Sequence, residues 1–293
     1  MLVSIIIPAF NEEILLPACL EAIAKLDFPS DKFETIVIDN NSTDRTKEII
    51  RRYPVRYVFE PIRNRAMARN AGIRLAQGTF IAMTDADCIV QPNWLNVLLS
   101  NFTDDTIAAC AGPYTGGSAT HLLQRFNQDH FERTIVKNHA SISPFLAGPN
   151  AMVRKSVFEQ IGLFDPAFVT MEDLEFAYRI YAAGLQIRWT EQTKVSHEFS
   201  PSLPSNLRTW FGYGAHAVLL RKKYSRVLHA LTSFHPKELL SILLRFLGLC
   251  KNVWTSVVAG TKEYPTSYHL LYLASYISYQ CGFFFGWYAL MFN

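Results

Sequence analysis

The stretch TFIAMTDAD, residues 79–87, decides the fold of this chain. Its apolar part, residues 79–84, predicts a buried parallel strand that runs directly into Asp85, Ala86 and Asp87. Residues two apart on an extended chain project to the same side, so we expect both carboxylates to face one hard cation. Open parallel sheets bind ligands at the edge where the strands end, which favours a metal–nucleotide site over the alternative, a solvated acidic turn.

Upstream of this stretch, apolar runs alternate with helix patterns. The runs cover residues 3–7, 35–38 and 55–59, and helices are expected from Asn11 and Glu12 onward, over 44–52 and over 65–76. This alternation predicts an α/β fold with a doubly wound, Rossmann-like, mostly parallel sheet. After Asp87 the pattern loosens into an expected helix over 92–99, a strand over 108–114 and a turn at Gly116 and Gly117.

Polar residues also stand where the first two predicted strands end. Asn11 and Glu12 follow the first strand, and Asp39 ends the second. A carboxylate at such a position can accept hydrogen bonds from a base or ribose, although Asp in a DNNS cluster also forms turns without any ligand. Arg69 lies on the helix before residues 79–87 and could reach a phosphate or the base, or belong to a solvated basic face.

A second block of interest begins near residue 143. Gly148 and Asn150 belong to a tight polar turn that allows close backbone approach to a sugar or acceptor, or that simply connects two elements. Glu172 and Asp173 open an amphipathic helix in which Leu174, Ala177, Tyr178 and Tyr181 share one face. The helix dipole favours a charged acid there, either as a base or as a helix cap.

His197 is a lone histidine in a strand-like segment, VSHEF. Such a histidine is either a structural group or a metal ligand. His197 is therefore a third candidate metal ligand, in addition to Asp85 and Asp87.

The chain divides by charge into two expected domains, residues 1–204 and residues 205–293. Residues 205–264 hold nine basic and two acidic residues, a net charge of +7, so the rest of the 293-residue chain carries −4 of the total +3. Residues 264–293 contain no Lys, Arg, Asp or Glu and are rich in Tyr and Trp, which prefer membrane interfaces. We expect a helical extension that associates with a membrane surface, by spanning it or lying on it; the alternative is ordinary helices packed on the first domain.

Five motifs together carry a family resemblance. Read in order, SIIIPAFNEE, VIDNNSTDRT, ARNAGIRLAQGTFIAMTDAD, GPNAMVRKSVFEQIGLFD and MEDLEFAYRIYAAG resemble family 2 glycosyltransferases with the GT-A fold, from residue 3 to about residue 197. The resemblance implies an inverting transfer from a nucleotide-diphospho sugar to an acceptor hydroxyl, commonly with Mn²⁺ or Mg²⁺. It also implies a lipid-linked or saccharide acceptor. The net charge of +3 is too small to indicate a nucleic-acid partner, and none is expected.

The resemblance assigns roles residue by residue. Asp85 matches the acid nearer the ribose, Asp87 the acid nearer the metal, and Asp173 the general base, with Glu172 beside it. The matches to nucleotide contacts are Pro8, Ala9, Asn11 and Glu12 in the first loop, Asp39 at the base and Arg69 at the nucleotide or phosphate.

Two departures from the family pattern matter. The common DDGS appears as DNNS, with Asn40 and Asn41 in place of the second acid and the glycine, and the Q-x-x-R-W signature of processive synthases is absent. We therefore expect single addition, in cell-surface polysaccharide or glycolipid synthesis, on the cytoplasmic side of the cell membrane. Two alternatives stay open. One is a nucleotidyltransferase, although the glycine-free first loop PAFNEE counts against it, and the other is a catalytically silent, membrane-bound subunit that binds sugar nucleotides.

Overall fold

The computed structural model describes residues 2–117, 121–131, 146–199, 202–224, 247 and 266–292. The chain divides into two compact units. The first comprises residues 1–119 and 128–199, and the second comprises residues 120–127 and 200–293. Sequence reasoning did not foresee that residues 120–127 group with the C-terminal unit.

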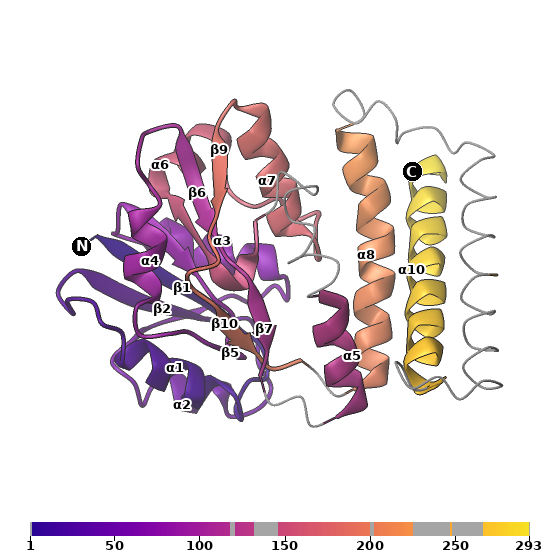
Figure 1. Ribbon diagram of the computed structural model, residues 1–293, viewed down its shortest axis with the longest axis horizontal. Helices are drawn as coiled ribbons and strands as arrows, with labels where there is room; N and C mark the ends of the chain where they lie inside the picture. The colour runs from indigo at the N-terminus through magenta and orange to yellow at the C-terminus, as the bar shows by residue number, and fades with distance from the viewer. Residues whose placement is uncertain are drawn as a thin grey trace. The chain divides into compact units, whose positions relative to one another are not determined.

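A seven-stranded, mostly parallel sheet forms the centre of the first unit (Figure 1). Its strands, in spatial order, are β3 (Arg56–Phe59), β2 (Phe33–Asp39), β1 (Val3–Ala9), β4 (Phe80–Met83), β8 (Ala151–Arg154), β6 (Ile107–Ala111) and β9 (Gln186–Trp189). Only β8 runs antiparallel to its two neighbours. The expected α/β fold with a mostly parallel sheet is confirmed.

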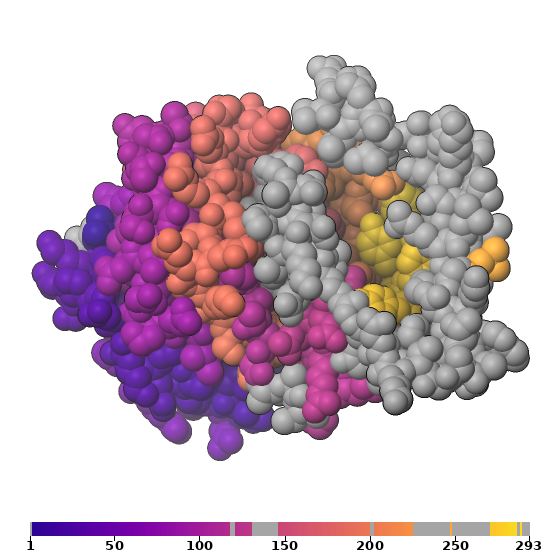
Figure 2. All heavy atoms as spheres, viewed as in Figure 1, coloured from indigo at the N-terminus to yellow at the C-terminus, as the bar shows by residue number. Residues whose placement is uncertain are grey.

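A second, three-stranded sheet has the order β5 (Cys88–Ile89), β10 (Val195–His197) and β7 (Tyr114–Gly116). It brings His197 opposite Cys88, so a segment more than 100 residues downstream lies beside the acidic motif. On the surface, the orange atoms that precede residue 200 lie among magenta and indigo atoms from much earlier in the chain (Figure 2).

Helices cover both faces of the large sheet, which explains why its strands read as continuous apolar runs. Along β1, Ile6 packs into one core cluster and its neighbours Ile5 and Ile7 into the other. The Ile6 cluster is completed by α3 (Arg65–Leu75), α6 (Lys155–Ile161) and α7 (Glu172–Ala182). The opposite cluster is completed by α1 (Leu16–Ala24), α2 (Thr46–Ile50) and α4 (Trp94–Ser100).

Three local predictions were wrong. The first helix begins at Leu16 rather than near Asn11, because the chain between them is used in loop hydrogen bonds described below. The strand expected over 108–114 is two strands, β6 and β7, separated by Gly112 and Pro113, since proline cannot donate to a strand ladder. Gly116 lies in β7 rather than in a turn.

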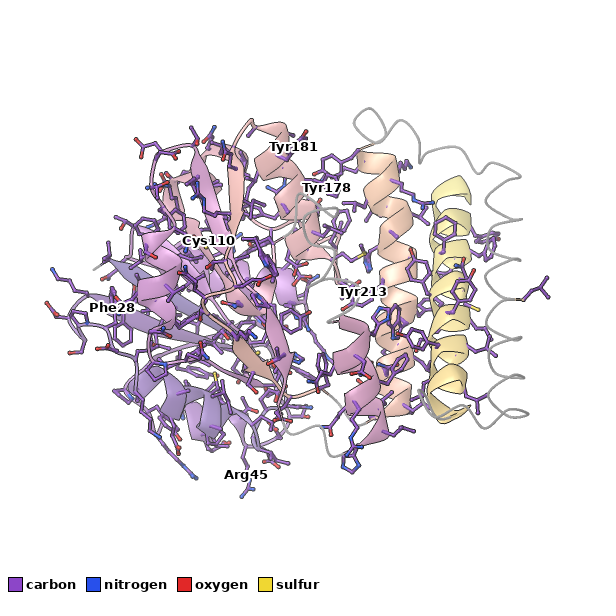
Figure 3. The ribbon with its side chains drawn as sticks, in the orientation of Figure 1. Phe28, Arg45, Cys110, Tyr178, Tyr181 and Tyr213 are labelled. Carbon is purple, nitrogen blue, oxygen red and sulfur yellow. The ribbon has the colours of Figure 1, made fainter. Side chains whose placement is uncertain are left out.

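The buried face of α7 also differs from the predicted one. The side chains that pack inward are Glu172, Glu175, Phe176, Ala177 and Ile180. Tyr181 is instead 57 % exposed (Figure 3). Two buried acids occupy positions that an apolar stripe would take, and charged residues are rarely buried unless they are paired. Glu175 is bound by Arg179, and Glu172 belongs to the candidate site.

The second unit contains the first part of α5 (Leu122–Phe131), α8 (Leu203–Lys223) and α10 (Thr266–Phe292). The last two helices approach closely at glycines: a Cβ on Gly214 would lie 1.9 Å from the Tyr279 carbonyl oxygen, and one on Gly282 would lie 1.8 Å from that of Phe211. The Ser278 hydroxyl donates to the Leu207 carbonyl at 2.6 Å. Ser278 and Gly282 lie four residues apart on α10, and small residues at this spacing let helices pack closely.

Among the residues that the structure describes, no helix is both long enough and apolar enough to cross a membrane. The sequence also holds an apolar run at residues 239–258, interrupted by Arg245 and Lys251, for which an interfacial amphipathic helix is the prediction. It lies outside the described residues except for Leu247.

Candidate active site

The first loop is tied to the loop that follows β2. The backbone N–H of Asn11 donates to Ser42 Oγ at 3.0 Å, and that of Glu12 donates to Thr46 Oγ1 at 2.8 Å. The Asn11 side-chain oxygen in turn accepts from the Thr43 N–H at 2.8 Å. These bonds hold Asn11 at φ 56°, a left-handed conformation that Asn adopts more readily than most residues.

Asp39 lies at the bottom of these loops, 2 % exposed. Its two oxygens accept from the Ser42 N–H at 2.9 Å and from the Tyr57 hydroxyl at 3.2 Å. Each carboxylate oxygen has two lone pairs, so each keeps acceptor capacity for a ligand. Beside it on β1, Ala9 pairs with Asp39 in register, and Pro8 pairs with Ile38.

The Asn40 and Asn41 departure has a structural explanation. The Asn40 amide donates to the carbonyls of Glu60 and Ile62 at 3.2 and 2.6 Å, and the Asn41 amide donates to that of Pro61 at 3.1 Å. Asn41 has φ 65°, the conformation that a glycine supplies in DDGS. The two asparagines thus preserve the turn and bind the loop after β3 to the loop after β2.

The two acids that follow β4, which were both expected to face one cation, have different partners in the structure. The strand ends at Met83, so the extended geometry behind that expectation does not reach Asp85 and Asp87. Asp85 accepts from Arg69 Nη2 at 2.8 Å. Burial raises the pKa of Asp85, but the charges of Arg69, Arg65 and His197 and the hydrogen bond from Arg69 together outweigh it and leave that pKa lowered.

Asp87 faces His197 instead. Asp87 Oδ2 lies 3.4 Å from His197 Nε2, and the ligand atoms of Asp87, Cys88 and His197 lie within 4.8 Å of one another. Burial raises the pKa of the Cys88 thiol well above its usual range. A carboxylate oxygen suits Mn²⁺ or Mg²⁺ better than a soft sulfur does, so Asp87, with the imidazole of His197 beside it, fits a divalent cation. Within the part of the chain that the structure describes, Asp85 is outside this group.

The packing of His197 explains its orientation. Its ring contacts those of Tyr114 and Phe199, with centroids 5.4 and 4.7 Å away. Its Nδ1 is buried with no hydrogen-bond partner among the described residues. The sequence offered His197 as a candidate ligand but could not place it beside Asp87.

Glu12 adds a third carboxylate to this edge of the sheet. Burial raises its pKa to about 8, and the charges of Asp87 and Asp85 contribute to the same shift. Carboxylates that raise the pKa of a neighbouring acid in this way favour a bound divalent cation, whose charge would offset theirs. Ala86, between the two aspartates, is 2 % exposed and packs into the core, so only its backbone is available to a ligand.

Glu172 and Asp173 diverge at the start of α7. Met171 precedes them with φ 65°, an uncommon conformation for a residue with a side chain. Glu172 is 1 % exposed and accepts from Arg69 Nη1 at 2.6 Å. Asp173 is partly exposed, and its oxygens accept from the Gly148 N–H at 3.2 Å and the Leu174 N–H at 2.8 Å.

Arg69 joins the two acidic groups rather than facing a ligand. It is 1 % exposed, and its two terminal nitrogens are bound to Asp85 and Glu172. The structure therefore offers no direct phosphate contact from Arg69, because a phosphate would have to displace a buried carboxylate from it.

The turn at residues 148–150 has two separate roles. A Cβ on Gly148 would lie 2.8 Å from Arg69 Nη2 and 3.1 Å from Asp173 Oδ2, so only glycine leaves both side chains in place. Asn150 is fully buried, accepts from Trp94 Nε1 at 2.9 Å and donates to the Pro113 carbonyl at 2.8 Å. These bonds use its side chain to hold the turn, and its expected contact with a sugar or acceptor stays a prediction.

Sequence reasoning left one site residue unassigned. Arg65 begins α3, one helical turn before Arg69, and its Nη1 lies 4.0 Å from Glu172 Oε1. The available signal was the spacing of four, which places the two arginines on one helix face.

Comparisons with known proteins agree with this geometry. The model of the family "Glycosyl transferase family 2" matches residues 4–162, more than half of the chain. Glycosyltransferase AglE of Haloferax volcanii is 26 % identical over 80 % of this chain and 82 % of its own length. O-antigen chain rhamnosyltransferase RfbN of Salmonella typhimurium is 24 % identical over 92 % of this chain and 95 % of its own.

Among solved structures, mannosyltransferase PcManGT of Pyrobaculum calidifontis, in complex with GDP-Man and Mn²⁺, superposes with a TM-score of 0.73. The superposition covers 98 % of this chain and 87 % of that one at 19 % identity, which shows a shared fold. Together with the family match, this similarity identifies the chain as a member of glycosyl transferase family 2 with the GT-A fold.

Proposed function

We propose that this chain transfers a sugar from a nucleotide-diphospho sugar, bound with Mn²⁺ or Mg²⁺, to an acceptor hydroxyl with inversion at the anomeric carbon. The proposal depends on one observation: a candidate cation site and a candidate base lie in the same site. Asp87 and His197 fit a divalent cation, and the partly exposed carboxylate of Asp173 lies across the Arg69 bridge from them. The mannosyltransferase with a similar fold binds GDP-Man and Mn²⁺, which supports the donor class.

Each residue then has a distinct task. Asp39 and the first loop hold the nucleotide, and Asp85 lies where the ribose would contact it. When bound, the cation supplies positive charge opposite the leaving diphosphate. Asp173 takes the acceptor proton, and the N–H groups of Gly148 and Leu174 stabilise the carboxylate and fix its direction.

The product class is part of the proposal. RfbN acts, by its name, on an O-antigen chain, and its similarity extends over nearly its whole length. We therefore place the reaction in cell-surface polysaccharide or glycolipid synthesis. The absence of Q-x-x-R-W supports addition of a single sugar.

A donor screen followed by transfer tests the proposal. UDP- and GDP-sugars are screened for thermal stabilisation with Mn²⁺, since a ligand at 100 times its Kd adds about 2.7 kcal/mol. The donors that bind are then incubated with lipid-linked and saccharide acceptors, and the anomeric configuration and number of added sugars are read by NMR and mass spectrometry. A silent subunit would bind donors but neither transfer nor hydrolyse them, and a nucleotidyltransferase would form donors from a sugar phosphate and nucleoside triphosphate.

The second unit supports association with the cytoplasmic membrane surface. On α10 the exposed apolar side chains Leu270, Ile277, Phe284 and Tyr288 recur at spacings of seven, seven and four, which place them on one helix face. α8 ends with Arg221, Lys222 and Lys223, which complement anionic headgroups. An apolar face beside a basic helix end fits a protein that lies on an anionic lipid surface.

Co-sedimentation with vesicles tests this part separately. The intact chain should pellet with vesicles containing anionic lipid and much less with purely zwitterionic ones. Ile277→Glu with Phe284→Glu should release it, whereas Ile14→Glu, equally apolar and 82 % exposed on the first unit, should not. Equal pelleting of all three proteins would contradict the assignment.

A further inference from the structure

Two arginines of α3 approach the candidate site and differ in one property. Arg69 is buried and bound to two carboxylates, and its Nε is also buried, with no hydrogen-bond partner in the described part of the chain. The side chain of Arg65 is 54 % exposed, and its guanidinium reaches to within 4.0 Å of Glu172. Of the two, only Arg65 is accessible to an incoming ligand.

The charge of Arg65 also acts on both halves of the site. Its positive charge acts on Glu12, on Asp85 and Asp87, and on Glu172, which lie in two loops and at the start of α7. A diphosphate entering this edge of the sheet is repelled by those of the acids that are charged. A positive group beside the cation would reduce this repulsion and so favour diphosphate binding.

The position of Arg65 suits that task. It is the first residue of an 11-residue helix whose Asn64 cap accepts from the Met67 N–H, so the positive end of the helix dipole lies at the same place. A guanidinium presents paired donors that match two phosphate oxygens. If Arg65 moved toward a phosphate, Glu172 would keep its shorter bond to Arg69, at 2.6 Å.

We infer that Arg65 binds the diphosphate of the donor. Arg69 is a positioning residue, which holds Asp85 and Glu172 away from the diphosphate. This inference rests on the proposed function. It assigns to Arg65 the phosphate contact that the family pattern assigns to Arg69.

Binding of inorganic pyrophosphate with Mn²⁺ tests the inference without knowledge of the base or sugar. Calorimetric titrations compare the intact protein with Arg65→Gln, Arg65→Lys and Arg74→Gln, a control on an exposed arginine at the other end of α3. Arg65→Gln should weaken Mn²⁺–pyrophosphate binding by about 10- to 100-fold, the range for a charge-assisted hydrogen bond. Arg65→Lys should lie between, and Arg74→Gln should match the intact protein.

Nucleosides separate a phosphate contact from general damage. UDP and GDP should lose affinity for Arg65→Gln by the same factor as pyrophosphate, whereas uridine and guanosine should lose none. The inference is overturned if the intact protein binds no Mn²⁺–pyrophosphate, if Arg65→Gln binds it normally, or if that variant loses nucleoside affinity equally. If Arg65→Gln loses pyrophosphate but the intact protein transfers no sugar from any donor, the proposed function fails and the diphosphate contact stands.

Discussion

Exchange of each acid at the start of α7 for its amide should separate the proposed base from its structural neighbour. Asp173→Asn keeps the size of the side chain but removes its ability to accept a proton. We expect turnover to fall by about 10²–10⁴-fold with donor affinity nearly unchanged. Glu172→Gln should act first on stability and donor binding, because Glu172 is buried against Arg69.

The structure sets the stability cost of each change. In Asp173→Asn one of the two oxygens becomes an NH₂ group that meets an N–H donor. The oxygen should remain on Leu174, whose bond is 2.8 Å, and the 3.2 Å bond from Gly148 should be lost. The loss of this hydrogen bond should lower the free energy of unfolding by about 0.5–1.5 kcal/mol. Each kcal/mol corresponds to a decrease in Tm of roughly 2–4 °C. Glu172→Gln removes one charge from a buried pair, a change that costs up to about 3–5 kcal/mol.

The assay combines steady-state transfer, donor titration and thermal unfolding of both variants. The expected pattern is a stable, inactive Asp173→Asn and a destabilised Glu172→Gln that keeps part of its turnover. The assignment is refuted if Asp173→Asn turns over at a near-normal rate while a folded Glu172→Gln is inactive, because the two roles would then be reversed.

Three further predictions concern the cation and the turn at residue 148. Asp87→Ala should abolish the activity that EDTA removes from the intact protein. His197→Gln should lower the affinity for Mn²⁺ by about tenfold or more. If calorimetric titration shows that neither variant binds Mn²⁺ more weakly than the intact protein, the cation lies elsewhere. Gly148→Ala inserts a methyl group 2.8 Å from a buried guanidinium nitrogen, so kcat should fall more than donor affinity, and an unchanged kcat would show that the turn does not position the base. The free energy of unfolding of the metal-free protein should decline as pH rises from about 4.5 to about 8, because folded Glu12 retains a proton that the unfolded chain has released. Urea denaturation at both ends of that range should show the slope shrinking when Mn²⁺ is added, and a slope that Mn²⁺ leaves unchanged would contradict the proximity of Glu12 to the cation.

Much of the fold could be predicted because the sheet is buried on both faces. Continuous apolar runs that alternate with helix patterns leave few other arrangements, and β1, β2 and β4 lie close to their predicted bounds. The errors lie where tertiary contacts override local pattern. Glu172 and Glu175 occupy the inner face of α7, which no periodicity argument allows unless their arginine partners are known.

The residues of the site could be found from sequence more readily than their partners. Strand ends and the D-x-D spacing pointed to Asp39, Asp85 and Asp87, and all of them lie at one edge of the sheet. The sequence could not show that Arg69 is 1 % exposed, because Glu172 is 103 residues away. Nor could it show that His197 pairs with Asp87, since that depends on β10 adding to β5.

The Arg69 bridge has a consequence that neither acid shows alone. One guanidinium fixes Asp85, on the donor side, and Glu172, beside the proposed base, at 2.8 and 2.6 Å. A displacement of either carboxylate therefore changes the position of the other through a rigid, buried group. Because donor and acceptor must meet at reacting distance, such a link couples the geometry of the nucleotide edge to that of the base. The burial that keeps Arg69 from the substrate is thus what allows it to hold both halves of the site in register.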